Sequence, residues 1–517
     1  MQKDSSQNYI NSGTKIILLF ALIDLLLHLY SNAFANYGIF RDEYYYIACS
    51  KRLAAGYVDQ PPFSIYILAV WRFFFGDSLF AIRFVPAVVS AITVYVTGLI
   101  VRKMNGGNTA IVIACLALIA APIFLGVNLI YSMNTFDWFL SALTALLLIK
   151  IINEKRNTLW VWLGIVFGIG LLNKVGFLWL GFGTAVGLLL TTERKYLKTK
   201  WPYIACAIAL VIFSPFIFWN MTHHWAHLEF IRNATSEKYS SLNAMTFISG
   251  FILTLNPINI FIWLAGLYYF IFNNQGKKYR LIGIIFIVSF LVLIINGHSK
   301  SEYLAPEITM LFAGGGIIWE KWIKNRALKW VKFALPVVMA MSGILFIPLA
   351  LPVLPVKVYI SYSEKLGIKP SSSENKKLSE LPQFYADMFG WKNMAATVSR
   401  VYTSMPPAEQ SKAVVFALNY GEAGSLEYYK KDYPLPEIIS GHNNYWLWGY
   451  NRSIKDPVII IIGGRLEDHL KSCDSVITAA VIRSKYAMPY ETNLPVFICK
   501  GMKYPIKEIW TKVKNFE

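Results

Sequence analysis

The sequence predicts an α-helical protein that crosses a membrane many times and ends in an exported α/β domain. Of its 517 residues, 56% are hydrophobic and only 15% are charged, whereas soluble domains carry about 25% charged residues. Apolar stretches of about 17 to 25 residues, long enough to cross a bilayer core of about 30 Å, recur up to Leu354 and then stop. Residues 1–354 are therefore the predicted membrane domain, and residues 355–517 the exported domain.

The apolar stretches predict about eleven membrane-spanning helices. They lie near residues 13–35, 79–101, 109–130, 135–152, 158–173, 175–192, 201–220, 246–272, 281–297, 303–319 and 331–354. The first stretch follows a polar segment and lacks a clear small-residue cleavage site, so it is expected to be a retained span rather than a signal peptide.

The charges of the loops predict the orientation of these spans. Basic pairs such as Arg102-Lys103, Arg194-Lys195 and Lys277-Lys278 fall in loops on one side of the predicted bundle. By the positive-inside rule that side is cytoplasmic. This explains the formal net charge of +19 without nucleic acid as a partner. The loops at 36–78, 128–134, 221–245 and 297–302 then lie outside, together with the C-terminal domain.

The first outer loop, at 36–78, carries the run Arg41-Asp42-Glu43 followed by three tyrosines. Juxtamembrane charges beside an aromatic belt are the structural interpretation. The functional interpretation is that Arg41 pairs with one carboxylate and leaves the other free to act as a base. Further along this loop we expect a helix near residues 44–55, and an aromatic stretch from Phe63 to Phe75 that is too short to span and lies in the membrane interface.

Other ionisable side chains lie near the outer ends of predicted spans. Asp137 opens the fourth span, where a carboxylate is costly unless it faces a polar cavity or a partner. Pairing with Arg83 or Lys174 is the structural alternative, and these two cations can instead neutralise an anionic ligand or reach the lipid headgroups. Lys300 and His298, in a short outer loop, are better candidates for binding phosphate, since lysine is a mobile point charge.

The outer loop at 221–245 is rich in histidine. His223, His224 and His227 are close enough in sequence to bind a metal ion together, but no matching carboxylate pattern accompanies them. Packing within the loop is therefore the favoured interpretation of these three side chains.

The C-terminal part predicts a small α/β domain. The expected strands are Ala413–Leu418, Val458–Ile462 and Val496–Cys499, and the expected helices are Met394–Tyr402 and Ala423–Lys430. The turn from Asn419 to Gly424 is similar to a phosphate-binding turn but lacks the full glycine pattern, which argues against nucleotide binding. Cys473 and Cys499 form either a disulfide, which an oxidising compartment permits, or two buried thiols.

The membrane part resembles the GT-C glycosyltransferases. The resemblance rests on one long span, an acidic pair in a long outer loop, the Gly56-Tyr57-Val58-Asp59-Gln60-Pro61-Pro62 turn and many later spans. It is closest to bacterial members of the dolichyl-phosphate-mannose protein mannosyltransferase family, glycosyltransferase family 39, whose superfamily includes the aminoarabinose lipid A transferases. It is strongest from Arg41 to Trp138. The segments 419–429 and 440–449 look like the exported domain of a bacterial subgroup.

The resemblance implies that a sugar moves from a polyprenyl-phosphate donor to a lipid, glycan or protein acceptor outside the bacterial inner (cytoplasmic) membrane, with inversion at the anomeric carbon. It also implies that Asp42 is the catalytic base and that Glu43 is its partner. The family works with or without a divalent metal ion, depending on the branch, so metal use stays open. The expected donor-phosphate ligands are Arg83, Lys300, His298 and Lys174, and the expected acceptor or cavity residues are Tyr45, Asp59, Gln60, Asp137 and His224.

One position departs from the aminoarabinose branch, which has a lysine before the paired prolines where this chain has Gln60. Phosphate recognition is therefore expected elsewhere, and lipid A is a less favoured acceptor. The alternative function is a transporter or flippase of a lipid-linked glycan, but transporters usually show internal repeats and midplane charges, and neither is evident. A membrane-anchored binding module is a third interpretation, which about eleven spans disfavour.

Overall fold

The computed structural model describes residues 2–35, 37–238, 243–325, 328–372, 374, 376–454 and 456–517. Residue 36, where the predicted first outer loop begins, and residues 239–242 of the loop predicted at 221–245 lie outside the described residues. The chain divides into two compact units. Unit 1 comprises residues 1–36, 76–218 and 241–355, and unit 2 comprises residues 37–75, 219–240 and 356–517.

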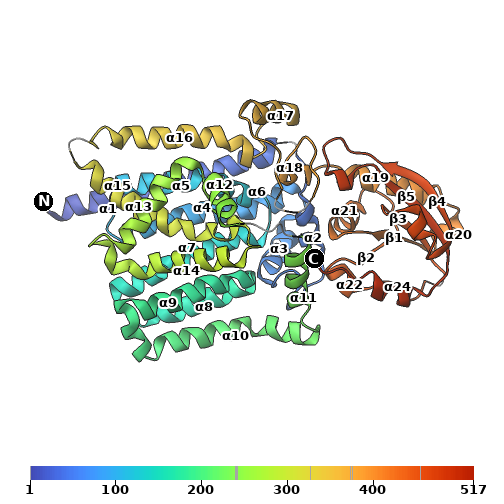
Figure 1. The fold of residues 1–517 in the computed structure, drawn as a ribbon, viewed down its shortest axis with the longest axis horizontal. Coiled ribbons are helices and arrows are strands. Elements are labelled where there is room, and N and C mark those ends of the chain that lie inside the picture. Colours follow the sequence, from blue (N-terminus) through green and yellow to red (C-terminus); the bar gives the residue numbers. More distant parts are fainter. Residues whose placement is uncertain are drawn as a thin grey trace. The chain divides into compact units, whose positions relative to one another are not determined.

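Unit 1 is a bundle of long helices that run alongside one another, such as α4, α5 and α7 (Figure 1). Its helices are α1 (Gln2–Phe34), α4 (Leu79–Lys103), α5 (Asn108–Ile119), α6 (Pro122–Leu129), α7 (Met133–Glu154), α8 (Thr158–Asn173), α9 (Leu178–Leu190), α10 (Trp201–Thr222, which continues into unit 2), α12 (Ala244–Thr254), α13 (Ile260–Ile271), α14 (Arg280–Asn296), α15 (Ile308–Ile323) and α16 (Val331–Ala350).

The described helices support six membrane spans by length and composition, or up to nine if each of three bent helix pairs is one span. A multi-pass membrane protein is thereby confirmed, but the predicted count of eleven is not. Each predicted stretch is helical, yet α8 and α15 have only 16 residues each. At 1.5 Å per residue they reach about 24 Å, which is short of the bilayer core.

Prolines mark two of the bends. Pro122 follows the break between α5 and α6, where the helix axis turns by 59°, and Pro257 follows the break after α12, where it turns by 104°. Proline lacks an amide hydrogen and its ring excludes the preceding turn of helix. The continuous hydropathy of these stretches therefore concealed two bends.

Unit 2 joins the first outer loop and the histidine-rich loop to the C-terminal domain. Its helices are α2 (Arg41–Ser50), α3 (Phe63–Phe75), α11 (Ala226–Asn233), α17 (Val356–Lys365), α18 (Gln383–Ala386), α19 (Trp391–Thr403), α20 (Pro407–Gln410), α21 (Tyr420–Tyr429), α22 (Asn444–Trp448), α23 (Leu466–His469) and α24 (Ile506–Lys512). The aromatic stretch predicted at Phe63 to Phe75 is helix α3, with Phe73 and Phe74 exposed.

The C-terminal domain contains a five-stranded mixed sheet in the order β2-β1-β3-β5-β4, with α19 and α21 packed on it (Figure 1). Its strands are β1 (Ala413–Ala417), β2 (Glu437–Ser440), β3 (Val458–Ile462), β4 (Cys473–Ile482) and β5 (Leu494–Met502). Strand β1 pairs in parallel with β2 and β3, while β5 pairs antiparallel with β3 and β4. A disulfide joins Cys473 of β4 to Cys499 of β5, which decides between the two alternatives for these cysteines.

Two glycines let helix α21 approach helix α2 closely within unit 2. A Cβ atom on Gly424 would stand 2.9 Å from the backbone carbonyl carbon of Tyr44, and one on Gly421 would meet the side chain of Arg41. These glycines belong to the turn that is similar to a phosphate-binding sequence. Their role in the fold is helix packing, which brings the first outer loop and the C-terminal domain together.

Candidate functional site

Helix α2 places the acidic pair in its first turn. The Glu43 carboxylate accepts a hydrogen bond of 2.8 Å from the backbone N–H of Phe40, which caps the helix, and the helix dipole favours carboxylates at this end. The helix therefore begins at Arg41, three residues before the expected helix at 44–55. Glu43 is fully buried, and Asp42 is the one residue of α2 that is not buried.

Arg41 contacts three carboxylates within unit 2, one of which, Asp42, belongs to the acidic pair. Its Nε lies 3.3 Å from Oδ1 of Asp42, and its Nη2 and Nη1 lie 3.4 Å from Glu374 and 3.7 Å from Asp387. Nη1 also donates to the hydroxyl of Tyr490 at 2.8 Å. Burial raises the pKa of Asp387 to about 6, and the guanidinium of Arg41 opposes this rise.

The C-terminal domain supplies a second group that holds Asp42. The hydroxyl of Tyr420, the first residue of α21, donates to Oδ1 of Asp42 at 2.8 Å. With Arg41 on the same oxygen, Oδ1 is fixed by two donors, while the carboxylate retains an exposed fraction of 37%. Both of these contacts fall on Oδ1 rather than on Oδ2.

The turn before the paired prolines packs beside α2. The Tyr45 hydroxyl donates to Oδ1 of Asp59 at 3.0 Å and lies 3.2 Å from the side-chain oxygen of Asn444 in α22. That oxygen also accepts the backbone N–H of Val58 at 2.7 Å. Gln60 is fully buried, and within the described chain no group forms a hydrogen bond with its side-chain amide. Tyr45 and Asp59 are therefore brought together as one polar pair.

Two histidines of the 221–245 loop, His227 and His223, make separate local contacts. His227 is buried, its Nδ1 lies 2.9 Å from the carbonyl oxygen of Val58, and burial lowers its pKa to about 4. His223 stacks on Trp219 with ring centroids 4.3 Å apart. His224 adopts a left-handed backbone, with φ of 54°. Among the described residues, no three His, Cys, Asp or Glu side chains gather as metal ligands.

Unit 1 contains a polar cluster around Lys174. Its ammonium donates to Asn134 at 2.8 Å and to Oδ2 of Asp137 at 3.3 Å, and it lies 4.8 Å from the ring centre of Tyr303. Asp137 thus pairs with Lys174, one of the two partners considered for it. Because Lys174 is already neutralised by a carboxylate, its positive charge is less available to a phosphate.

The remaining cationic candidates also belong to unit 1. Arg83 lies inside α4 and is 1% exposed, and its backbone carbonyl accepts a hydrogen bond of 3.1 Å from Asn32. Lys300 lies 3.9 Å from Glu302 at a partly buried position. His298, two residues earlier, has a buried Nδ1 for which no described group serves as hydrogen-bond partner.

A small cavity in unit 1 is lined by Asp137, Tyr303 and Glu307 among others, and its volume is about 20 Å³. This is room for about one water molecule. Oε1 of Glu307 accepts a hydrogen bond of 2.6 Å from Ser289. Glu307 thus shares a cavity with Asp137 and Tyr303 of the Lys174 cluster. The cavity is too small for a sugar ring.

Several site residues were missed by the sequence reasoning. Arg41 contacts Glu374, Asp387 and Tyr490, and Asp42 contacts Tyr420. Each of these four partners lies more than 300 residues further along the chain than the residue it contacts. The resemblance of the segment 419–429 to an exported domain was the one signal that pointed near Tyr420.

Unit 1 also contains Asp24 and His28, a fully buried pair 3.8 Å apart in α1, which stands out in the sequence as two ionisable residues inside an apolar span.

Comparisons with known proteins give the fold of most of the chain. Residues 59–219 match the family model described as dolichyl-phosphate-mannose-protein mannosyltransferase. No curated protein matches the sequence. Two solved structures of ArnT from Cupriavidus metallidurans are similar, one in the apo state (14% identity, TM-score 0.60) and one bound to undecaprenyl phosphate (13% identity, TM-score 0.59). Each match covers 94% of this chain and 98% of the other.

The chain has the GT-C fold. The predicted fold class, a helical membrane domain of GT-C type followed by a small C-terminal α/β domain, is thereby confirmed. The family-model match begins at Asp59 and ends at Trp219. It thus includes the Asp-Gln-Pro-Pro turn, while the acidic pair of α2 precedes it in this GT-C chain.

Proposed function

We propose that this protein is a membrane glycosyltransferase. It transfers a sugar from a polyprenyl-phosphate donor to an acceptor hydroxyl on the extracytoplasmic side of the bacterial inner membrane. The GT-C fold, the match to a mannosyltransferase family model and the similarity to a structure of ArnT bound to undecaprenyl phosphate support this class of reaction. The acceptor is a lipid, glycan or protein.

One observation carries the assignment of the catalytic base. Asp42 is the one residue of α2 with an accessible side chain, and two donors hold its Oδ1. A carboxylate held at one oxygen presents the other in a fixed direction, which is what a general base requires. Glu43 is buried and accepts the N–H of Phe40, so its part is to fix the helix that carries Asp42.

The proposed reaction uses Asp42 in this geometry. Oδ2 of Asp42 removes the proton from the acceptor hydroxyl as its oxygen attacks the anomeric carbon from the face opposite the phosphate. The new glycosidic bond forms while the bond between the anomeric carbon and the phosphate oxygen breaks. The electron pair leaves with the polyprenyl phosphate, and the configuration inverts. A positioned general base contributes about 10² to 10⁴ in rate.

The departing phosphate gains negative charge, and cations stabilise it. Arg83, Lys300 and His298 remain the proposed phosphate ligands in unit 1. Lys174 ranks below them because it is paired with Asp137. Tyr45, Asp59, Gln60 and His224 of unit 2 remain the proposed acceptor or cavity residues.

The test is transfer by the purified full chain, measured as release of polyprenyl phosphate from a synthetic polyprenyl-phosphate sugar offered with candidate acceptors. Asp42→Asn should lower kcat by about 10² to 10⁴. Glu43→Gln, which keeps an oxygen to cap the helix, should lose much less, and Asp432→Asn, an exposed carboxylate of unit 2, should match the wild type. Unchanged transfer by Asp42→Asn would refute the base assignment. Movement of lipid-linked glycan without release of lipid phosphate would favour a flippase.

A further inference from the structure

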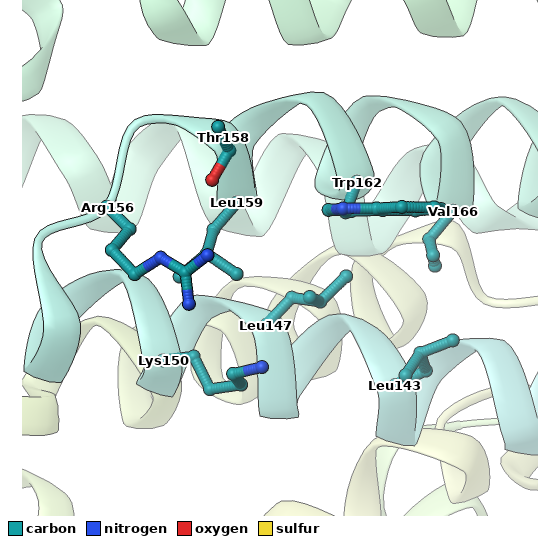
Figure 2. A pocket seen from close by; sticks show the side chains of 8 residues that line it. All are labelled: Leu143, Leu147, Lys150, Arg156, Thr158, Leu159, Trp162 and Val166. Carbon is teal, nitrogen blue, oxygen red and sulfur yellow. The ribbon is translucent and has the colours of Figure 1, made fainter.

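A groove of about 320 Å³ lies between the antiparallel helices α7 and α8 of unit 1. Lys155, which has a left-handed backbone with φ of 52°, ends α7, and α8 begins three residues later. Side chains from both helices and from Arg156 in the connecting turn line the groove (Figure 2). The groove belongs to unit 1, whereas Asp42 belongs to unit 2.

The lining is polar at one end and apolar at the other. Lys150, Arg156 and the hydroxyl of Thr158 lie near the turn that joins the helices (Figure 2). Leu143, Trp162 and Val166 lie at the far end, with Leu147 and Leu159 between the two ends (Figure 2). From Lys150 to Leu143 the groove runs along α7 for seven residues, about 10 Å at 1.5 Å per residue. A groove with a basic end and an apolar end is suited to an amphiphile with an anionic head.

The polar end has excess positive charge. Glu154 is the carboxylate at this end, and both of its oxygens are engaged, one by Lys103 at 3.1 Å and the other by Arg156 at 3.7 Å. Lys150 makes no ion pair within the part of the chain that the structure describes. Three cations thus surround one carboxylate, and the side chain of Arg156 is 65% exposed. An anionic ligand would neutralise this charge.

The exposed Trp162 is a residue type typical of the membrane interface. Its side chain is exposed, although it lies one turn into an otherwise apolar helix. Tryptophan collects where acyl chains meet headgroups, and basic residues collect on the cytoplasmic side. A basic pocket between membrane helices at this level is suited to an anionic lipid headgroup.

We propose that this groove binds an anionic glycerophospholipid of the cytoplasmic leaflet. The lipid phosphate lies between Lys150 and Arg156 and accepts the hydroxyl of Thr158. One acyl chain runs over Leu147 and Leu143 beside the indole of Trp162. The charge complementarity favours an anionic lipid over a zwitterionic one. The apolar end of the groove favours a lipid over free phosphate, because free phosphate has no acyl chain to bury against it.

The experiment uses the purified full chain in detergent and a photoactivatable phosphatidylglycerol with a diazirine in one acyl chain. Cross-links should map to residues 143–166 and should be displaced by unlabelled phosphatidylglycerol, but not by the same concentration of phosphatidylcholine or inorganic phosphate. The double variant Lys150→Gln and Arg156→Gln should weaken this labelling about twenty-fivefold, at about fivefold for each basic residue. The double variant Lys155→Gln and Lys198→Gln removes two exposed charges that do not line the groove and should label like the wild type.

Equal loss of labelling in the two double variants would overturn the proposal, because it would show a diffuse surface charge rather than a site. Displacement by phosphatidylcholine or by inorganic phosphate would also overturn it. If the Lys150 and Arg156 double variant does not fold, Leu143→Trp tests the same groove by filling its apolar end. That variant should abolish the cross-links between residues 143 and 166 with all basic residues intact, and full labelling would refute the groove.

Discussion

Tyr420→Phe tests whether the C-terminal domain orients Asp42, the proposed catalytic carboxylate. The substitution deletes one hydroxyl and keeps the ring that packs against Tyr45 with centroids 5.0 Å apart. The lost hydrogen bond of 2.8 Å ends on a carboxylate, and such bonds contribute about 1.5 to 3 kcal/mol. Arg41 still holds Oδ1 at 3.3 Å. We therefore expect the lower end of this range, a fall in kcat of about tenfold.

The assay is the release of polyprenyl phosphate, with kcat and KM determined separately. KM for the donor should stay within about twofold, because the hydroxyl acts through Asp42 on the reacting acceptor and not on the lipid. Tyr44→Phe is the matched control. Tyr44 lies in α2, the helix that carries Asp42, but its hydroxyl contacts Tyr429 at 3.3 Å and not Asp42. A Tyr420→Phe variant with the kcat of the wild type, or a Tyr44→Phe variant with an equal loss, would refute the reasoning.

Three further predictions concern the stability of unit 2. Cys473→Ser should lower its free energy of unfolding by about 3.5 kcal/mol, the loop-closure entropy of a disulfide to Cys499, 26 residues away. Unfolding in urea followed by proteolysis measures this, and an unchanged midpoint contradicts it. Burial raises the pKa of Glu422 to about 7 and that of Glu491 well above its usual value. The folded state therefore binds protons that the unfolded chain releases, so Tm should fall as the pH rises from about 4.5 through about 7. Glu491→Gln should flatten this slope, and a Tm that rises with pH would show the sign to be wrong. Gly424→Val should lower the free energy of unfolding by about 1 to 3 kcal/mol, because the larger side chain overpacks α21 against α2. The measurement is the Tm of the purified chain, which should fall. An unchanged Tm would mean that α21 can move away from α2 without loss of stability.

Charge and hydropathy patterns predicted what depends on local sequence. The acidic pair stood out because Asp42 and Glu43 follow closely on an apolar span. Each expected span is helical in the structure. The strands β1, β3 and β5 were predicted because they are short apolar runs. The edge strand β4 was missed, although residues 476–482 are largely apolar and most of the strand's side chains are exposed. Strand β2 has only four residues, the first of them Glu437.

Patterns of local sequence did not predict contacts made over long chain distances. Arg41 meets Glu374 at a separation of 333 residues, and no periodicity links the two positions. The glycines at 421 and 424 were seen only as an incomplete phosphate-binding pattern, because close approach to a helix elsewhere in the chain leaves no local mark. The buried position of Glu43 is likewise a consequence of packing, so the sequence alone treated it as an equal partner of Asp42.

The long separation between Asp42 and Tyr420 has a consequence for biogenesis. The two residues are 378 positions apart, and ribosomes add about 5 to 20 residues per second. The carboxylate is therefore made about 20 to 75 seconds before the hydroxyl that holds it. During this interval Asp42 lacks one of the two donors to its Oδ1. In a nascent chain that already has most of its membrane helices, the proposed base would thus be incompletely oriented. The proposed transfer would reach its full rate only after the C-terminal domain has folded onto the first outer loop.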